Sequence, residues 1–79
     1  MDIKILGTGC PKCKTVEKAT REVVTENGFT ATVSKVEDIM DIMQYGVMGT
    51  PAIVVNGKVE IKGRVPSKDE ITKLLTKLQ

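Results

Sequence analysis

The stretch Ile3-Lys4-Ile5-Leu6-Gly7-Thr8-Gly9-Cys10-Pro11-Lys12-Cys13 decides the fold. It opens with an apolar run that favours a strand, and this run gives way to a turn with two glycines. Proline then suits the first turn of a helix, because the N–H that it lacks would have no partner there. The stretch therefore predicts a strand, a short turn and a helix start, with Cys10 and Cys13 within one helical turn of each other.

The chain has 79 residues and two cysteines, which stand at C-x-x-C spacing. At a helix start this spacing lets both sulfur atoms meet, so the pair can form a reversible disulfide that closes a very short loop. Thiols in the cytoplasm are kept reduced, and a structural disulfide is not expected there. A close pair of thiols in that compartment indicates either catalysis or metal binding.

Length and composition predict one globular domain over residues 1–79. A chain of this size buries only ~60% of the surface that it exposes when unfolded, so its stability is modest. The net charge of +2 and the lack of a basic run with interleaved aromatic residues argue against a nucleic-acid partner. No stretch approaches the ~20 apolar residues of a membrane span, and Met1–Lys4 lacks the pattern of a signal peptide. We expect a cytoplasmic monomer with no membrane partner.

The first helix is expected to run from Pro11 to about Asn27-Gly28, where the glycine provides a C-terminal stop. Residues at helical spacing place Cys13 at the top of the buried face and leave Cys10 at the exposed tip. The other members expected on this face are Val16, Thr20 and Val23, with Ala19 and Val24 beside them.

Residues 29–34 alternate between apolar and polar, which predicts an edge strand covered on one face. A second helix is expected over residues 36–44, and its apolar face should consist of Val36, Ile39, Met40 and Met43. We expect Met40, Met43 and Met48 to fill the core.

Residues 52–55 form an uninterrupted apolar run, as expected of a central strand, and Asn56-Gly57 predicts a hairpin to a last strand over residues 58–62. Ser67 and Glu70 resemble a capping box at the start of a helix whose apolar face is Ile71, Leu74, Leu75 and Leu78. The predicted order is β-α-β-α-β-β-α, an α/β fold with a four-stranded mixed sheet flanked by three helices.

This order, with C-P-K-C after the first strand and Thr50-Pro51 before the third, resembles the thioredoxin fold in its minimal, glutaredoxin-sized form. The likeness covers nearly the whole chain. It is strongest to small redox-active disulfide proteins, which share the C-P-x-C after a Gly-rich turn and the G-T-P-A segment, here residues 49–52. The resemblance implies a thiol-disulfide oxidoreductase that needs no bound cofactor.

The resemblance also implies roles for individual residues. Cys10 would be the attacking thiol and Cys13 the resolving thiol. Pro51 would be a cis-proline facing the disulfide, and Thr50 would offer backbone hydrogen bonds to a substrate chain. The residues expected to contact the substrate are Pro11, Lys12, Thr50 and Pro51.

The partners implied are proteins that carry disulfides and a thioredoxin-reductase-like flavoprotein that returns electrons. Glutaredoxins carry a Gly-Gly-x-Asp-like stretch that holds glutathione, whereas here Gly63–Ser67 stands in that place. No acidic residue is evident beneath the cysteines. The N–H groups of the helix start and the charge of Lys12 are expected to lower the pKa of Cys10.

Metal binding is the alternative for the two cysteines, because paired thiolates suit Cu(I) or Zn. The segment from Gly9 to Ala19 also looks like the start of a small soft-metal chaperone domain. That fold has the order β-α-β-β-α-β and ends in a strand, whereas residues 71–78 predict a helix. Two cysteines also leave a zinc site short of four ligands, so no metal is expected.

Overall fold

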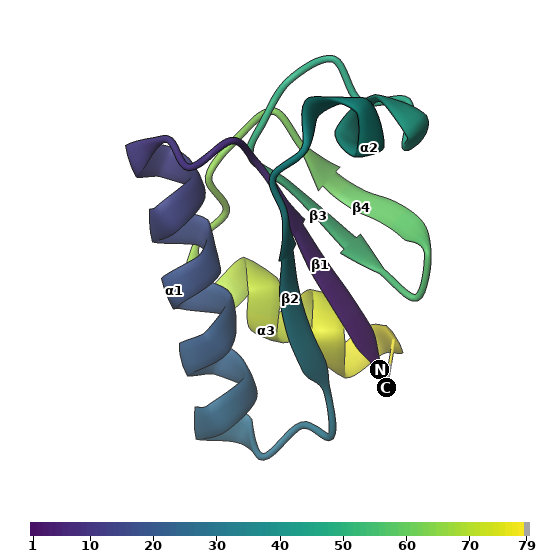
Figure 1. Cartoon of the computed structure of the whole chain (residues 1–79). Helices are drawn as coiled ribbons and strands as arrows, with labels where there is room; N and C mark the ends of the chain where they lie inside the picture. The colour runs from purple at the N-terminus through teal and green to yellow at the C-terminus, as the bar shows by residue number, and fades with distance from the viewer. Residues whose placement is uncertain (79) are drawn as a thin grey trace.

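The computed structural model describes residues 1–78, and Gln79, the last residue of the expected domain, lies outside the described residues. Residues 1–78 form a four-stranded sheet of order β2-β1-β3-β4 and three helices, as predicted (Figure 1). The elements in chain order are β1 Asp2–Leu6, α1 Pro11–Asn27, β2 Thr32–Val36, α2 Ile39–Gln44, β3 Ala52–Val55, β4 Lys58–Lys62 and α3 Lys68–Leu78.

The sheet is mixed, because β1 runs parallel to β2 and antiparallel to β3. Every residue of β3 is buried, which confirms the prediction of a central strand. The turn to β4 uses Asn56 at φ 51° and Gly57 at φ 84°. Positive φ angles at both positions are what a two-residue hairpin turn requires, and Asn-Gly is the sequence that tolerates them best.

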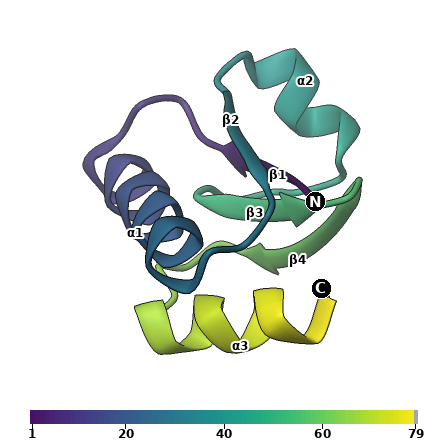
Figure 2. The same ribbon diagram turned by 90° about the horizontal axis from the view of Figure 1, so that it is seen from below.

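The helices lie on both faces of the sheet (Figure 2). α1 and α3 pack on one face, where the larger core contains Ile3, Ile5, Val16, Val23, Ile53, Val55, Ile61, Ile71 and Leu75. α2 lies on the other face, over a smaller core of Leu6, Ile42, Val47, Ala52 and Val54. Among residues 1–78, no helix combines the length and the apolar character needed to cross a membrane.

α1 presents to the core the four residues that its spacing predicts, Cys13, Val16, Thr20 and Val23. The hydroxyl of Thr20 is buried and donates a hydrogen bond of 2.8 Å to the carbonyl of Val16, which removes the cost of an unpaired polar group. Gly28 ends the helix at φ 65°, a left-handed conformation that glycine adopts without strain.

The strand predicted over 29–34 and the helix predicted over 36–44 both begin later in the structure. Val36 remains in β2, where it pairs with Leu6 and accepts a hydrogen bond from the N–H of Gly7. Asp38 then caps α2, because its side chain accepts a hydrogen bond of 2.8 Å from the N–H of Met40. Pairing with β1 therefore sets the extent of β2, and the Asp38 cap sets the start of α2.

The predicted apolar face of α2 was wrong. Ile39, Met40 and Met43 are 61%, 67% and 64% exposed, and Met48 is fully exposed. The helix has six residues, too few for a long packed face, and it anchors itself to the sheet through Ile42. The three methionines expected in the core therefore lie on the surface.

The start of α3 uses half of the predicted capping box. The side-chain oxygen of Ser67 accepts a hydrogen bond of 3.2 Å from the N–H of Glu70. The carboxylate of Glu70 does not return to Ser67 but binds the guanidinium of Arg64 in a two-pronged pair, with Nη1 to Oε1 at 2.7 Å.

These packing differences predict unequal effects of truncation on stability. Leu75→Ala removes a side chain with no exposed surface and should lower the free energy of unfolding by about 2–5 kcal/mol. Ile39→Ala removes a side chain that is 61% exposed and should change it by no more than about 0.5 kcal/mol. Urea denaturation followed by circular dichroism measures both. Equal losses would contradict the placement of α2.

Candidate functional site

The two cysteines lie where β1 passes into α1. Cys10 is the N-cap of α1 with extended backbone angles, φ −68° and ψ 161°, and Pro11 takes the first helical position. The sulfur of Cys10 accepts a hydrogen bond of 3.3 Å from the backbone N–H of Cys13. A thiol thus fills the role that a Ser or Asp side chain usually has at a helix start.

The two thiols are free and differ in exposure. Cys10 is half-buried, whereas Cys13 is 5% exposed. Gly7 makes room for the buried one, because a Cβ added at Gly7 would overlap the sulfur of Cys13 and lie 2.7 Å from its Cβ. The end of β1 can therefore pass beside Cys13 only with glycine at this position.

Hydrogen bonds lower the pKa of Cys10 from its ordinary value. The largest cause is the hydrogen bond from the side chain of Cys13, followed by the bond from the Cys13 backbone N–H, and the backbone of Lys12 adds to them. A bond donated to a thiolate favours the charged form. We expected the charge of Lys12 to lower the pKa of Cys10. The contribution of Lys12 comes instead from its backbone, and its side chain is exposed.

Burial raises the pKa of Cys13, because it disfavours the charged form of the thiol. The hydrogen bond to Cys10 and the charge of the Cys10 sulfur act in the same direction. A hydrogen bond with the Thr50 side chain acts against them. When the pair loses its first proton, the negative charge is therefore favoured on the sulfur of Cys10, and the remaining proton is favoured on Cys13.

The structure brings Thr50 to the cysteines from a loop far away in the sequence. Thr50 is half-buried and Pro51 is buried, and the peptide bond between them is cis. The carbonyl of Pro51 accepts a hydrogen bond of 3.0 Å from the N–H of Gly63. This bond holds the loop against the chain segment that follows β4.

A charged cluster beside Cys13 was missed by the sequence analysis. A hollow of about 50 Å³ is bordered by Cys13 and by Glu17, Lys35 and Glu37. Lys35 joins the two carboxylates, with its Nζ 3.8 Å from Glu17 and 3.6 Å from Glu37. The sequence analysis found no acidic residue evident beneath the cysteines, and it did not identify Glu17 and Glu37 as neighbours of the hollow beside Cys13. The i, i+4 spacing of Cys13 and Glu17 was a signal for one of the two.

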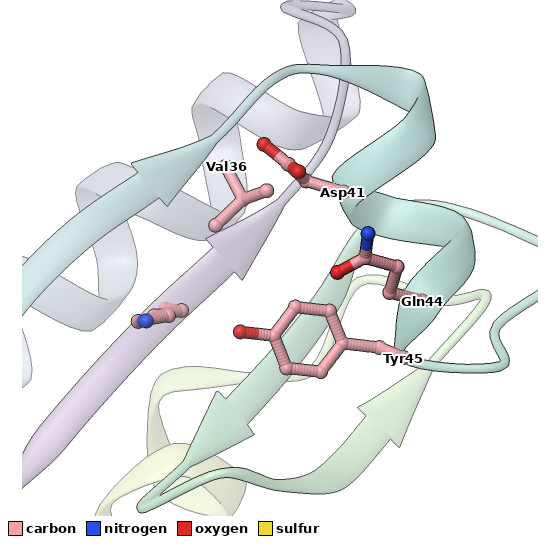
Figure 3. Close-up of a pocket in the computed structure, with 5 residues that line it drawn as sticks. Val36, Asp41, Gln44 and Tyr45 are labelled. Atoms are coloured by element: carbon pink, nitrogen blue, oxygen red, sulfur yellow. The ribbon is translucent and has the colours of Figure 1, made fainter.

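A larger hollow of about 320 Å³ lies between α2 and the sheet, away from the cysteines (Figure 3). Figure 3 shows the side chains of Asp41, Gln44 and Tyr45 around it, opposite Val36 of β2. Neither cysteine borders this hollow. It is therefore separate from the candidate redox site.

The structure also bears on the metal alternative. Over residues 1–78, no three His, Cys, Asp or Glu side chains are grouped so as to hold a metal ion. The described chain ends in α3, and its element order differs from the β-α-β-β-α-β order of the chaperone domain. The two element orders therefore agree over the opening β-α-β and differ after it.

Comparison with known proteins gives a consistent result. A family model described as "Thioredoxin domain" matches residues 1–76. A thioredoxin from Methanothermobacter thermautotrophicus is 42% identical over 76 residues, which is 96% of this chain and 99% of that protein. A thioredoxin from Methanocaldococcus jannaschii is 36% identical over 69 residues, covering 87% of this chain and 79% of that protein.

The close approach of Gly7 to Cys13 gives a test of the site. Gly7→Ala forces the Cys13 side chain to move and should lower the free energy of unfolding by about 1–3 kcal/mol. Gly49→Ala is the matched control, because its new Cβ would lie 3.6 Å from the nearest atom, the Cα of Gly63. Urea denaturation compares the two variants. A Gly7→Ala protein as stable as the control would show that Cys13 does not pack against Gly7.

Proposed function

The chain belongs to the thioredoxin domain family, a family of thiol-disulfide oxidoreductases, and on that basis we propose that Cys10 and Cys13 reduce disulfides in other proteins. The observation that carries the proposal is the asymmetry of the two thiols. The half-buried Cys10 has a lowered pKa and the buried Cys13 has a raised one. The thiolate is the attacking form in disulfide exchange.

In the first step, the Cys10 thiolate attacks one sulfur of the substrate disulfide. The substrate S–S bond breaks, a bond forms between Cys10 and that sulfur, and the other substrate sulfur leaves as a thiolate. The hydrogen bond from the Cys13 N–H, at 3.3 Å, keeps the attacking sulfur at the start of α1 throughout.

In the second step, Cys13 loses its proton and attacks the sulfur of Cys10. The mixed disulfide breaks, the second substrate sulfur leaves, and Cys10 and Cys13 become joined. The two substrate thiolates take up the proton from Cys13 and one proton from water, so two electrons pass from the dithiol to the substrate. The raised pKa of Cys13 keeps this thiol protonated until the mixed disulfide forms, because attack then removes the neighbouring negative charge.

We assign contact with the substrate to residues around the two sulfurs. Pro11 and Lys12 are exposed at the start of α1, and Thr50 and Pro51 approach from the opposite loop. Thr50 also acts on the pKa of the Cys13 thiol, which it lowers, and this supports a place for the loop at the substrate. The proposed unit is a monomer of one domain acting in the cytoplasm, where dithiols are maintained reduced.

Electrons would return to the oxidised protein from a thioredoxin-reductase-like flavoprotein. Support comes from the segment Gly63–Ser67, which takes the place of the glutathione-holding stretch. Its one cation, Arg64, is paired with Glu70 and so is already engaged. A carboxylate of glutathione would have to compete with this ion pair.

The roles of the cysteines are tested by substituting each one. Cys13→Ser should accumulate a mixed disulfide between Cys10 and insulin, because nothing resolves it, and Cys10→Ser should abolish insulin reduction. Mass spectrometry under non-reducing conditions measures the adduct, and the variant lacking both cysteines is the control. Adducts that accumulate with Cys10→Ser but not with Cys13→Ser would reverse the two roles.

The electron donor is tested in coupled insulin reduction. NADPH with a thioredoxin reductase should support turnover at least about tenfold faster than NADPH with glutathione and glutathione reductase. Loss of NADPH absorbance measures both rates, and mixtures without the protein give the background. Equal rates in the two systems would refute the assignment of the donor.

A further inference from the structure

The hollow of about 320 Å³ between α2 and the sheet is lined mainly by polar side chains (Figure 3). Lys4 borders it from β1 and Val36 borders it from β2. Asp41 and Gln44 of α2 complete the lining, together with Tyr45 at the C-cap of that helix. Small-molecule sites in proteins span about 300–1,000 Å³, so the hollow has room for a small ligand.

Lys4 lies in the middle of β1, which is a central strand of the sheet between β2 and β3. Its neighbours Ile3 and Ile5 belong to the larger core, so Lys4 lies on the α2 face, two residues before Leu6 of the smaller core. The Lys4 side chain is 36% exposed, and its Nζ lies 4.0 Å from the carboxylate of Asp2, which is 53% exposed. An ion pair of this length at the surface contributes little, so the Lys4 charge is available to a ligand.

Asp41 brings the opposite charge to the hollow from α2. It forms no ion pair with Lys4 or with any other cation of residues 1–78. The side chains of Gln44 and Tyr45 likewise form no hydrogen bond within the part of the chain that the structure describes. Figure 3 shows all three side chains on the side of α2 that faces β1 and β2. A cation, an anion and two neutral polar groups therefore surround one space with bonding capacity to spare.

We propose that this hollow binds a free α-amino acid with a small aliphatic side chain. The carboxylate of the amino acid pairs with Lys4, and its ammonium group pairs with Asp41. Its aliphatic side chain packs against Val36 and the ring of Tyr45. The two opposite charges favour a zwitterion over a simple carboxylate or a simple amine, because either of these leaves one charged side chain without a partner. This inference does not rest on the redox chemistry, because neither cysteine borders the hollow.

The test compares three ligands that share one aliphatic group: L-valine, isovalerate, which lacks the ammonium group, and isobutylamine, which lacks the carboxylate. Each is titrated into isotopically labelled protein and followed by NMR. L-valine should cause saturable shifts of the backbone amides of Lys4, Val36 and Tyr45, with a Kd of about 1 mM. Isovalerate and isobutylamine should bind at least about tenfold more weakly, because each leaves one charged group of the hollow unpaired.

Two variants show which side chain recognises which charge. Lys4→Met removes the partner of the carboxylate and should bind L-valine no more tightly than isobutylamine. Asp41→Asn removes the partner of the ammonium group and should bind L-valine no more tightly than isovalerate. Lys73→Met, at an exposed position of α3 on the opposite face of the sheet, is the control and should keep the full preference for L-valine. Cys10→Ser should bind L-valine as tightly as the wild-type protein does.

The wild-type titrations decide the proposal even if a variant fails to fold. The absence of saturable shifts at the hollow overturns it. Isovalerate or isobutylamine that binds as tightly as L-valine also overturns it, because the hollow then recognises a single charge. A preference for L-valine that survives in both Lys4→Met and Asp41→Asn places the ligand outside the hollow and overturns the assignment. None of these results bears on disulfide reduction, which the cysteine variants test separately.

Discussion

The hydrogen bond from the backbone N–H of Cys13 to the sulfur of Cys10 connects the fold with the chemistry. It caps α1, which covers one face of the sheet, and it favours negative charge on the sulfur that faces solvent. The same short segment requires glycine at position 7, because the end of β1 passes directly beside Cys13. The end of the strand, the start of the helix and the reactive thiolate therefore depend on one another within the seven residues from Gly7 to Cys13.

Features that depend on local sequence were predictable. The stripe Cys13, Val16, Thr20 and Val23, the Asn56-Gly57 turn and the Ser67 cap each follow from residues a few positions apart. α2 was not predictable in the same way. Its spacing suggested an apolar face toward the core, whereas in the structure Ile42 is the buried residue of this helix and Ile39, Met40 and Met43 are exposed. The side of a short helix that meets the sheet is a tertiary property that helical spacing does not contain.

The candidate site likewise combines residues that local motifs predicted with residues that they did not. The two cysteines and the Thr50-Pro51 loop were evident from motifs, whereas the neighbouring Lys35 and Glu37 were not. Lys35 borders the same hollow as Cys13, and β2 pairs with β1 in a register that sets Lys35 beside Ile5, which also borders that hollow. Strand register depends on pairing between distant segments, and residues 29–34 had suggested a strand that ended before Lys35. Because the predicted strand ended at residue 34, the sequence analysis did not place the charged side chains of Lys35 and Glu37 near the cysteines.

The two outer strands, β2 and β4, have a consequence for how the protein behaves at high concentration. An outer strand offers unpaired backbone groups to which the strand of another molecule can add, and charged side chains on it oppose that addition. β2 contains Lys35, and β4 contains Lys58 and Lys62, all of them exposed. Addition of another strand would take these charged side chains out of water, so the sheet resists growing into fibrillar aggregates even though the molecule displays methionines on its surface.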